Sequence, residues 1–584
     1  MTAATSPARI EQPGNVRITR LKIEKFRAIS SADIELGDTV ALVGQNGSGK
    51  SSILRALNAF FNFDDEKADF ENGNHAYSRT AQSVIEVTIE GLSSDPALPR
   101  LESRSDKLRA QLKFRKQPVW NVFEGGKWQS AVPGFHEALR KQVAYALIPT
   151  RRDHAVAHDP ATGLLERAVD EWVTSNRQRD RVSPQVAKLG GQLQKNSLSG
   201  FEKQLRKVAP ADGPFSFALS YSSQPDYKLL LTNLALSVNE GGQSIPLADS
   251  GSGTQSMAIF ALYAYLAELQ SKTFVLGMEE PEQNLHPQAQ RALINRIMGL
   301  GLQVLFTTHS PTVVDSLDHE QVVLCRRIKG KSRGLEAQIR QIPSSFFTQH
   351  KLDRDAYYKF HRRRNSEFIF ADFVTVTESP VDSAVILTLL QEAGADPVEL
   401  GMSVVALDGV AQIPHMFHIL RELGIASAFV VDKDYFLPYK SGERKTSLDS
   451  RGYPQYRAEA KADSLLSALF PETADHNKVV GQLVGNHQQA MASLREVGFF
   501  CFRYAMEIDL VVAQETRRRL FERLNLPAAD RTELHLLTAK SKVIKRQETL
   551  LPVLTGLKST SLPYSYKGLR SELPKMAKDA RQQP

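Results

Sequence analysis

The chain has 584 residues, enough for about two to four domains. Apolar residues make up 42% and charged residues 24%, which are ordinary globular values and exclude a fully disordered or fibrous protein. Lys and Arg number 73 against 65 Asp and Glu, a net charge of +8. Residues 521–584 hold 12 basic and 6 acidic residues, or +6 of that excess, which suggests a polyanion as partner.

The number of cysteines and the length of the apolar runs indicate where in the cell the protein is located. The two cysteines, Cys325 and Cys501, are too few for a disulfide framework and suggest a reducing compartment. The longest apolar run, Met257–Ala267, is shorter than the roughly 20 residues that a membrane span needs. Residues 1–15 are polar, without the apolar segment of a secretory signal, and we expect them to be flexible. We therefore expect a cytoplasmic protein without membrane contact.

The first part of the chain alternates strand-like and helical patterns. Period-2 alternation predicts strands at Val16–Ala28 and Ser83–Gly91, and an apolar run predicts another at Thr39–Val43. A helix should follow from Lys50 to Phe61. Gly163–Val208 reads as a helical insertion with one apolar face. The later elements that we expect are strands at Phe215–Tyr221, Lys228–Val238, Thr273–Met278 and Gln303–Thr307, with helices at Thr254–Gln270 and Pro287–Gly299.

A second strand–helix block follows a mixed, basic connection. Its strands, Phe368–Thr377, Ser403–Leu407 and Ala428–Val431, are short and apolar, as in a parallel sheet buried on both faces. Helices are expected at Val381–Ala393 and Ile413–Leu423. The fold class is therefore α/β. The predicted organisation is a flexible N-terminus (1–15), a first domain (16–345) with a helical insertion (160–210), a connector (346–366), a second domain (367–520) and a basic C-terminal region (521–584).

The strongest motif is a phosphate-binding loop. Gly44–Ser51 matches GxxxxGK[ST] between a strand and a helix, which is the context that this loop needs. Its glycines let backbone N–H groups point at phosphate, Lys50 would pair with the β- and γ-phosphates, and Ser51 would bind Mg²⁺. We expect ATP to contact Asn46, Gly47, Gly49, Lys50, Ser51 and Ser52.

Three later segments complete the predicted ATP site. The buried strand Thr273–Glu280 ends in two carboxylates: Glu279 would hold Mg²⁺ through water, and Glu280 would activate the attacking water. His309 follows another apolar strand and can hydrogen-bond the γ-phosphate. A turn of small residues before a helix forms an anion site at the helix N-terminus. The residues of that turn are Ser250, Gly251, Ser252 and Gly253.

Together these four segments resemble an ABC-type ATPase head, in the order Walker A, signature, Walker B and switch histidine. The sequences "LKIEKFRA" and "EEPEQNLHP" narrow the resemblance to the SMC and RecF-like branch. Glu279 stands where the Walker B aspartate is usual. In such heads the signature contacts the nucleotide of a second protomer. The resemblance therefore implies a homodimer or higher homo-oligomer, with the insertion as a candidate dimerisation element.

The second block carries four acidic residues at strand ends. Glu378 follows the first strand, Asp382 lies one helical turn further, and Asp432 and Asp434 follow the third strand. In a parallel sheet these ends share one edge, where converging carboxylates attract Mg²⁺ or Mn²⁺. The alternative is a set of solvated acids at helix caps. Two further acids, Glu507 and Asp509, could join the metal site, or could instead cap a helix.

This arrangement resembles the TOPRIM fold, although Ser379 stands where a glycine usually follows the glutamate. An ABC head followed by a TOPRIM domain is the layout of the OLD (overcoming lysogenization defect) family of nucleases, and the Gabija antiphage nuclease is similar in layout. The resemblance implies DNA cleavage with divalent metal and, in one class, a C-terminal lysine. Lys540, Lys542 and Lys545 are the candidates here, and Lys542 is favoured.

The sequence thus leads to a hypothesis and an alternative. The hypothesis is a DNA endonuclease or nickase in DNA processing or antiphage defence. Two metal ions would clamp the scissile phosphate, and the ATPase dimer would gate or position DNA. The basic C-terminal region and Arg362–Arg364 would contact DNA phosphates, and a helicase is a candidate partner. The alternative is an ATP-switched DNA-binding or repair clamp with a non-catalytic TOPRIM domain. A topoisomerase needs a tyrosine domain for which the chain is too short, and two cysteines exclude a zinc-ribbon primase.

Overall fold

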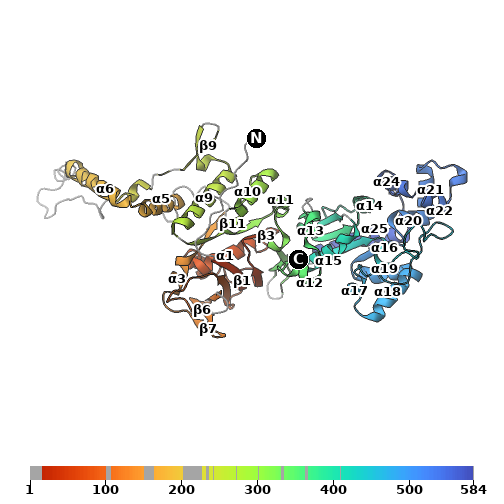
Figure 1. Cartoon of the computed structure of the whole chain (residues 1–584), viewed down its shortest axis with the longest axis horizontal. Coiled ribbons are helices and arrows are strands. Elements are labelled where there is room, and N and C mark those ends of the chain that lie inside the picture. Colours follow the sequence, from red (N-terminus) through yellow and green to blue (C-terminus); the bar gives the residue numbers. More distant parts are fainter. Residues whose placement is uncertain are drawn as a thin grey trace. The chain divides into compact units, whose positions relative to one another are not determined.

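A computed structural model describes residues 16–99, 107–149, 163–200, 226–231, 234, 236–240, 243–270, 272–299, 301–330, 334–361, 366–407 and 409–582. These residues form two compact α/β units (Figure 1). The first comprises the described residues within 1–42 and 49–313, and the second those within 43–48 and 314–584. No helix of the described ranges is long and apolar enough to cross a membrane.

The first unit contains a run of antiparallel strands. β1 pairs with β2 on one side and β4 on the other, and β4, β5, β6 and β7 continue the run. Leu21 is opposite both Ile34 and Val87, so the alternation seen in the sequence lines one buried face. The strands are β1 (Arg17–Phe26), β2 (Ile29–Glu35), β4 (Ser83–Glu90), β5 (Lys107–Phe114), β6 (Pro118–Glu124) and β7 (Lys127–Ser130).

The same unit contains a group of parallel strands that carries the predicted ATP motifs. Their order is β3, β12, β11, β8, and β11 is parallel to both of its neighbours. Gly277 in β11 cannot carry a side chain, because a Cβ there would lie 1.8 Å from the Tyr145 hydroxyl, which donates to the Leu54 carbonyl of α1 at 3.0 Å. The elements are β3 (Thr39–Gly44), α1 (Lys50–Phe61), β8 (Val143–Ile148), β11 (Thr273–Glu279), α10 (Pro287–Gly299) and β12 (Gln303–Thr308).

The helical insertion consists of α5 (Leu164–Ser175), α6 (Arg179–Leu193) and a π-helical turn (Gln194–Leu198). α5 packs against α9 (Ser252–Gln270), whereas α6 has no buried side chain among the described residues and extends beyond α5 (Figure 1). The stretch is helical, as the sequence predicts; its role in dimerisation stays a prediction.

The strand predicted at Lys228–Val238 is wrong for most of its length. Lys228–Leu231 forms the short helix α8, and the buried Leu231 is four residues after the buried Tyr227, which directly precedes the helix. Only β9 (Ser237–Glu240) is extended, and it pairs with β10 (Gln243–Pro246). The strand predicted at 215–221 lies outside the described residues.

The second unit is built on a parallel sheet in the order β16, β15, β17, β18. Thr377, the last residue of β15, is opposite Ala406 and Val430, so the strands end at one edge and Glu378 and Asp432 both lie there. The elements are β15 (Phe373–Thr377), α14 (Pro380–Glu392), β16 (Met402–Ala406), α15 (Ile413–Glu422), β17 (Ala426–Val431) and β18 (Phe499–Cys501).

The described part of the chain between the two strand–helix blocks contains regular elements. It contains the antiparallel hairpin of β13 (Val322–Ile328) and β14 (Glu336–Gln341), followed by α12 (Phe346–Gln349) and α13 (Arg354–His361). The domain boundaries drawn from the sequence stay predictions.

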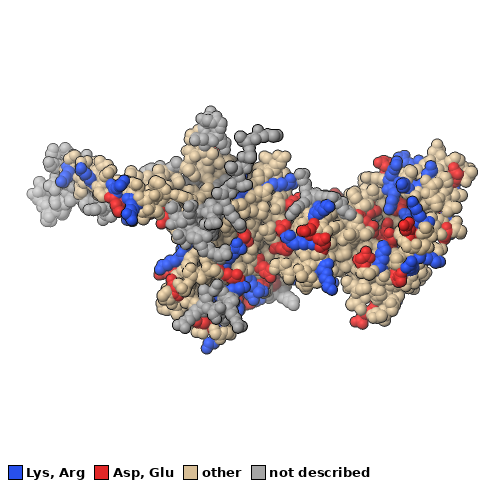
Figure 2. All heavy atoms as spheres, viewed as in Figure 1, with Lys and Arg blue, Asp and Glu red and all other residues tan. Residues whose placement is uncertain are grey.

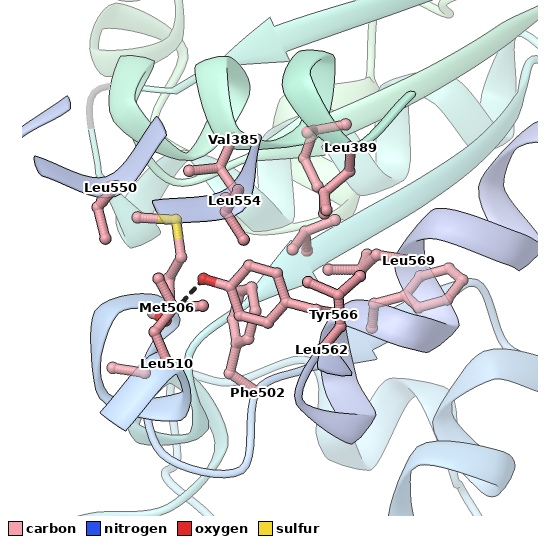
Figure 3. Close-up of a cluster of buried hydrophobic side chains, with 14 of the residues drawn as sticks. Val385, Leu389, Phe502, Met506, Leu510, Leu550, Leu554, Leu562, Tyr566 and Leu569 are labelled. Carbon is pink, nitrogen blue, oxygen red and sulfur yellow. Dashed lines mark hydrogen bonds between the residues drawn. The ribbon is translucent and has the colours of Figure 1, made fainter. Parts of the chain in front are cut away.

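The basic C-terminal region also contributes side chains to the hydrophobic core of the second unit. Its apolar side chains pack with α14 against the parallel sheet, and the Tyr566 hydroxyl donates to the Met506 carbonyl at 2.8 Å (Figure 3). This part is therefore amphipathic, with leucines inside and basic residues on its surface. The helices are α20 (Met506–Val512), α21 (Gln514–Arg523), α22 (Glu533–Thr538), α23 (Ser541–Ile544), α24 (Gln547–Leu554) and α25 (Tyr564–Gln582).

Candidate functional sites

The phosphate-binding loop has the backbone that an anion site needs. Gly47 and Gly49 have φ angles of +72° and +102°, which favour glycine, and Gly49 is the N-cap of α1. No side-chain hydrogen bond caps α1, and an uncapped helix N-terminus suits a phosphate group. Lys50 and Ser52 are buried, Ser51 is half-buried and Asn46 is exposed.

Two acids follow β11, and the second of them meets the predicted switch histidine. Glu280 has a left-handed φ of +44°, held by its N–H, which donates to Thr307 at the end of β12. The Nε2 atom of His309 lies 3.4 Å from Oε1 of Glu280. Burial lowers the pKa of His309, and the Lys50 ammonium lowers it further. The structure thus brings Lys50, Glu280 and His309 together; Glu279 is the last residue of β11.

Glu282 supports this site and has no role in the sequence analysis. It is buried, accepts a hydrogen bond from the Thr308 hydroxyl at 2.5 Å, and accepts another from the His309 N–H at 3.3 Å. Burial raises its pKa. Glu282 therefore holds the backbone that presents His309. The sequence signal for it was a third acid in the segment Glu279–Pro287.

The signature segment forms a closed turn before α9. The Ser250 hydroxyl donates to the Leu247 carbonyl at 2.7 Å, and the Gln255 amide donates to the carbonyls of Leu247 and Ser250 at 3.3 and 3.1 Å. Gly251 precedes α9, and Ser252 and Gly253 begin it. These hydrogen bonds fix the backbone that leads into α9, and the contact of this turn with a nucleotide stays a prediction.

In the second unit, three distant parts of the chain meet at the carboxyl edge of the sheet. The Asp432 N–H donates to Oε1 of Glu378 at 2.9 Å, and the Met506 N–H donates to Oδ1 of Asp432 at 2.9 Å. Ser379 caps α14 by accepting from the N–H of Asp382 at 3.4 Å. A serine after Glu378 therefore has a structural role, because it starts the helix that carries Asp382.

Burial and the charge of neighbouring acids raise the pKa of three acids at this edge. Burial raises the pKa of Glu378 to about 7, with further contributions from Asp434 and Asp382. Burial and then Glu378, Glu507 and other acids raise the pKa of Asp432 well above its usual range. Burial also raises the pKa of Asp382. Oxygen ligands that repel each other in this way suit divalent cations.

Glu507 belongs to this group of acids, and one of its carboxylate oxygens is left to bind a ligand. It is fully buried, and its Oε2 has no hydrogen-bond partner among the described residues. Its other oxygen accepts from Arg444 at 3.0 Å and lies 3.9 Å from the Lys545 ammonium. An orphaned buried carboxylate oxygen beside four further acids fits a metal-ligand role.

The lysine that faces the acids is Lys545. Glu507 raises its pKa most, and Asp432 and Asp382 add to the effect. Lys542, favoured from the sequence, is exposed and has no contact with the acids among the described residues; Lys540 is the N-cap of α23. Figure 2 shows Lys and Arg side chains gathered over α20, α21 and α24, with acidic side chains between them.

Asp509 does not point at this group, which corrects its prediction as a ligand. Its two oxygens accept hydrogen bonds from the N–H groups of Arg503 and Tyr504 and from the Ser565 hydroxyl, at 2.8, 2.9 and 2.6 Å. Burial raises its pKa to about 6. Asp509 therefore fixes the backbone just before α20, and it does not cap the helix, whose N-terminus has no side-chain cap.

Two residues of a long loop complete the acidic site and were missed from the sequence. Arg444 contacts Glu507, and the Tyr439 hydroxyl donates to Asp434 at 3.0 Å. The loop has no periodic pattern that could have marked them. Arg362–Arg364 lie outside the described residues.

One further acid and histidine cluster lies in the first unit. Ligand atoms of Glu66, Asp69 and His75 fall within 4.8 Å of one another. Arg55 and Asn58 already bind Glu66, and Glu66 binds His75 at 2.7 Å. This network ties α1 to α2 (Phe63–Glu71) and reads as structural.

Comparisons with known proteins give the class of each unit. The family model of an AAA ATPase domain matches residues 17–117 and 166–314. The model of an overcoming lysogenization defect protein-like TOPRIM domain matches residues 369–434. The chain thus combines an ATPase domain with an OLD-like TOPRIM domain, and the predicted fold class and resemblance are confirmed.

Two relatives align with most of the chain. One, named OLD nuclease, from Thermus scotoductus (strain ATCC 700910 / SA-01), is 25% identical over 71% of this chain and 82% of the relative. The other, Old nuclease of Escherichia phage P2, is 22% identical over 78% of this chain and 82% of the relative. Among solved structures, an Smc head domain from Pyrococcus furiosus aligns with 57% of this chain and 99% of its own, at 11% identity and a TM-score of 0.35.

Proposed function

We propose that this protein is an ATP-binding, divalent-metal-dependent DNA endonuclease or nickase that acts in DNA processing or antiphage defence. One observation carries the proposal: the Asp432 N–H donates to Glu378 at the carboxyl edge of the TOPRIM sheet, where burial and the neighbouring Asp434 and Asp382 raise the pKa of Glu378 to about 7. The names of the two relatives support the same activity.

The chain's own residues have distinct roles in this proposal. Glu378, Asp382, Asp432, Asp434 and Glu507 hold two divalent ions, Mg²⁺ or Mn²⁺, at the sheet edge. When bound, these ions supply Lewis-acid activation of the water and of the phosphodiester. Other residues orient the acids: the Asp432 N–H fixes Glu378, and Tyr439 fixes Asp434.

Two basic residues lie beside the acids and have different roles. Lys545 lies near Glu507 with its head partly in solvent, where it can offset the negative charge that develops on the phosphate. Arg444 is hydrogen-bonded to Glu507 and holds that carboxylate in place. Lys545 thus takes the role that the sequence analysis gave to Lys542.

The first unit binds ATP, and ATP binding controls how DNA is positioned for cleavage. Lys50 neutralises the β- and γ-phosphates, Ser51 and Glu279 hold Mg²⁺, and Glu280 takes a proton from the attacking water. By its resemblance to ABC-type heads, the signature turn contacts the nucleotide of a second copy of the chain, which completes the nucleotide site. The protein is therefore a homodimer or a higher homo-oligomer that positions DNA for cleavage.

Nicking of supercoiled plasmid in Mn²⁺ tests the proposal. The full chain should nick, EDTA should stop it, and Asp432→Ala should lower the rate by about 10³-fold or more, because a metal ligand is lost. Asp475→Ala, an exposed acid on α18 (Thr473–Gly485), is the matched control and should leave the rate unchanged. Full cleavage by Asp432→Ala would favour the ATP-switched clamp instead.

A further inference from the structure

A second charged feature of the TOPRIM unit lies beyond the acidic site. A cavity of about 980 Å³ opens beside the junction of α20 and α21 and the start of α25. Five basic side chains line it: Arg503, Arg517, Arg518, Arg531 and Lys567. α20 lies between the acidic site and the cavity. Glu507 on this helix belongs to the acidic site, and Asp509, two residues further along, lines the cavity.

The charge of the cavity is positive after its internal pairs are counted. Arg517 pairs with Glu533, and Arg518 with Glu515 and Glu522. The charge of the lining acid Asp509 is offset by three hydrogen-bond donors. Neither Arg503 nor Lys567 forms an ion pair with a described carboxylate. Arg531 also has no ion pair with a described carboxylate, although its Nε donates to the Leu526 carbonyl at 3.0 Å. Three lining cations therefore remain after the ion pairs are counted.

Backbone dipoles and neutral donors add to this positive field. α21 begins after Ala513 without a side-chain cap, and α25 begins at Tyr564; both helix starts line the cavity. Each helix N-terminus carries a partial positive charge and N–H groups that suit an anion. Burial lowers the pKa of His487 to about 3, so this residue is neutral and can hydrogen-bond without adding charge.

We propose that this cavity binds phosphate groups of a nucleic-acid strand whose scissile bond lies at the acidic site on the other side of α20. The inference rests on the proposed nuclease function and adds a second substrate contact to it. Guanidinium, ammonium and helix N-termini are the groups that bind phosphodiesters irrespective of sequence. A free nucleotide presents the same phosphate chemistry, and the experiment separates the two sources.

The test measures binding without cleavage. A short fluorescein-labelled DNA duplex is titrated with the full chain in EDTA over a series of salt concentrations. The double variant Arg503→Gln/Lys567→Gln should bind about tenfold more weakly or worse, and the slope of log affinity against log salt should become shallower by about 2, one phosphate contact for each lost cation. The control Lys478→Gln/Lys575→Gln removes two exposed lysines of the same unit, one of them on α25, and should keep the affinity of the wild type.

A second arm uses a fluorescent ATP analogue on a Lys50→Ala background, which removes the site of the first unit. Loss of this binding in the double variant, with DNA affinity intact, would identify a free nucleotide as the phosphate source. Equal binding of both probes by the double variant and its control would overturn the proposal. Because the assay contains no metal, a wild type that binds in this way but never nicks would contradict the proposed function alone. Thermal melting of each variant confirms that it is folded.

Discussion

In the first unit, the start of α1 offers the buried Lys50 and a helix N-terminus without a side-chain cap to an anion, whereas in the second unit the edge of the TOPRIM sheet offers carboxylates to cations. The anion site is made of consecutive residues, since the geometry of one turn is enough to bind phosphate. The cation site joins Glu378, Asp432 and Glu507 from separate parts of the chain. One site depends on local backbone and the other on the whole fold.

The first test of this comparison between the two sites concerns ATP hydrolysis and Glu280. Glu280→Gln should keep ATP binding and lower ATP hydrolysis by about 10²–10⁴-fold, because it removes the general base while keeping the side chain's size. A phosphate-release assay with a parallel nucleotide-binding measurement checks this. Normal hydrolysis by Glu280→Gln would show that another group takes the proton.

Lys50→Ala should weaken nucleotide binding by about 10²-fold or more, because the β- and γ-phosphates lose their buried counter-charge. Equilibrium binding of a fluorescent ATP analogue measures the change. Lys67→Ala, an exposed lysine on α2, is the control and should bind normally. The separation of the two sites also predicts that metal binding at Glu378 survives in Lys50→Ala.

The two candidate lysines of the second site should differ. Lys545→Ala should slow plasmid nicking by about 10- to 100-fold, since it removes a positive charge next to the acids. Lys542→Ala should leave the rate unchanged, because that side chain is exposed and away from them. Equal loss in both variants, or loss in Lys542→Ala alone, would reverse the assignment.

The smallest effect concerns the stability of the metal-free protein. The pKa of Glu378 is raised from 4.5 to about 7, so the folded state binds more protons than the unfolded state between these values. Stability should therefore fall as pH rises through this window. At pH 8 in EDTA, Glu378→Gln should raise the free energy of unfolding by about 1–3 kcal/mol, because the buried charge is gone.

Urea unfolding at pH 4.5 and pH 8 measures this difference, which should shrink at the lower pH. Adding Mg²⁺ at pH 8 should stabilise the wild type and leave Glu378→Gln less affected. A variant that is less stable than the wild type at both pH values would argue against mutual repulsion at this edge.

Sequence predicted the local features well. The phosphate-binding loop and the bounds of α1, Lys50–Phe61, follow from one contiguous pattern, and the structure has the same bounds. Glu378 and Asp432 could be placed at one edge because each directly follows an apolar strand. Parallel pairing then brings strand ends together without further information.

The sequence did not predict which residues belong to the acidic site where membership depends on the direction of a side chain. Glu507 and Asp509 are two residues apart on α20, and at about 100° per residue they point to nearly opposite sides of the helix. Which one meets the metal ligands depends on how α20 packs. Lys545 lies just after the short helix α23, so its direction depends on tertiary contacts too. Arg444 belongs to a loop without periodicity, and only the folded chain brings it to Glu507.

Titration calorimetry of Mn²⁺ into the metal-free full chain tests the central claim, that the carboxylates at the edge of the TOPRIM sheet form a two-metal site. To silence the ATP site, the Lys50→Ala chain is used without nucleotide. The account predicts two Mn²⁺ ions per chain, with both lost or greatly weakened in the double variant Lys50→Ala/Asp432→Ala and both kept when Asp475→Ala replaces Asp432→Ala. Unchanged Mn²⁺ binding after loss of Asp432 would contradict it.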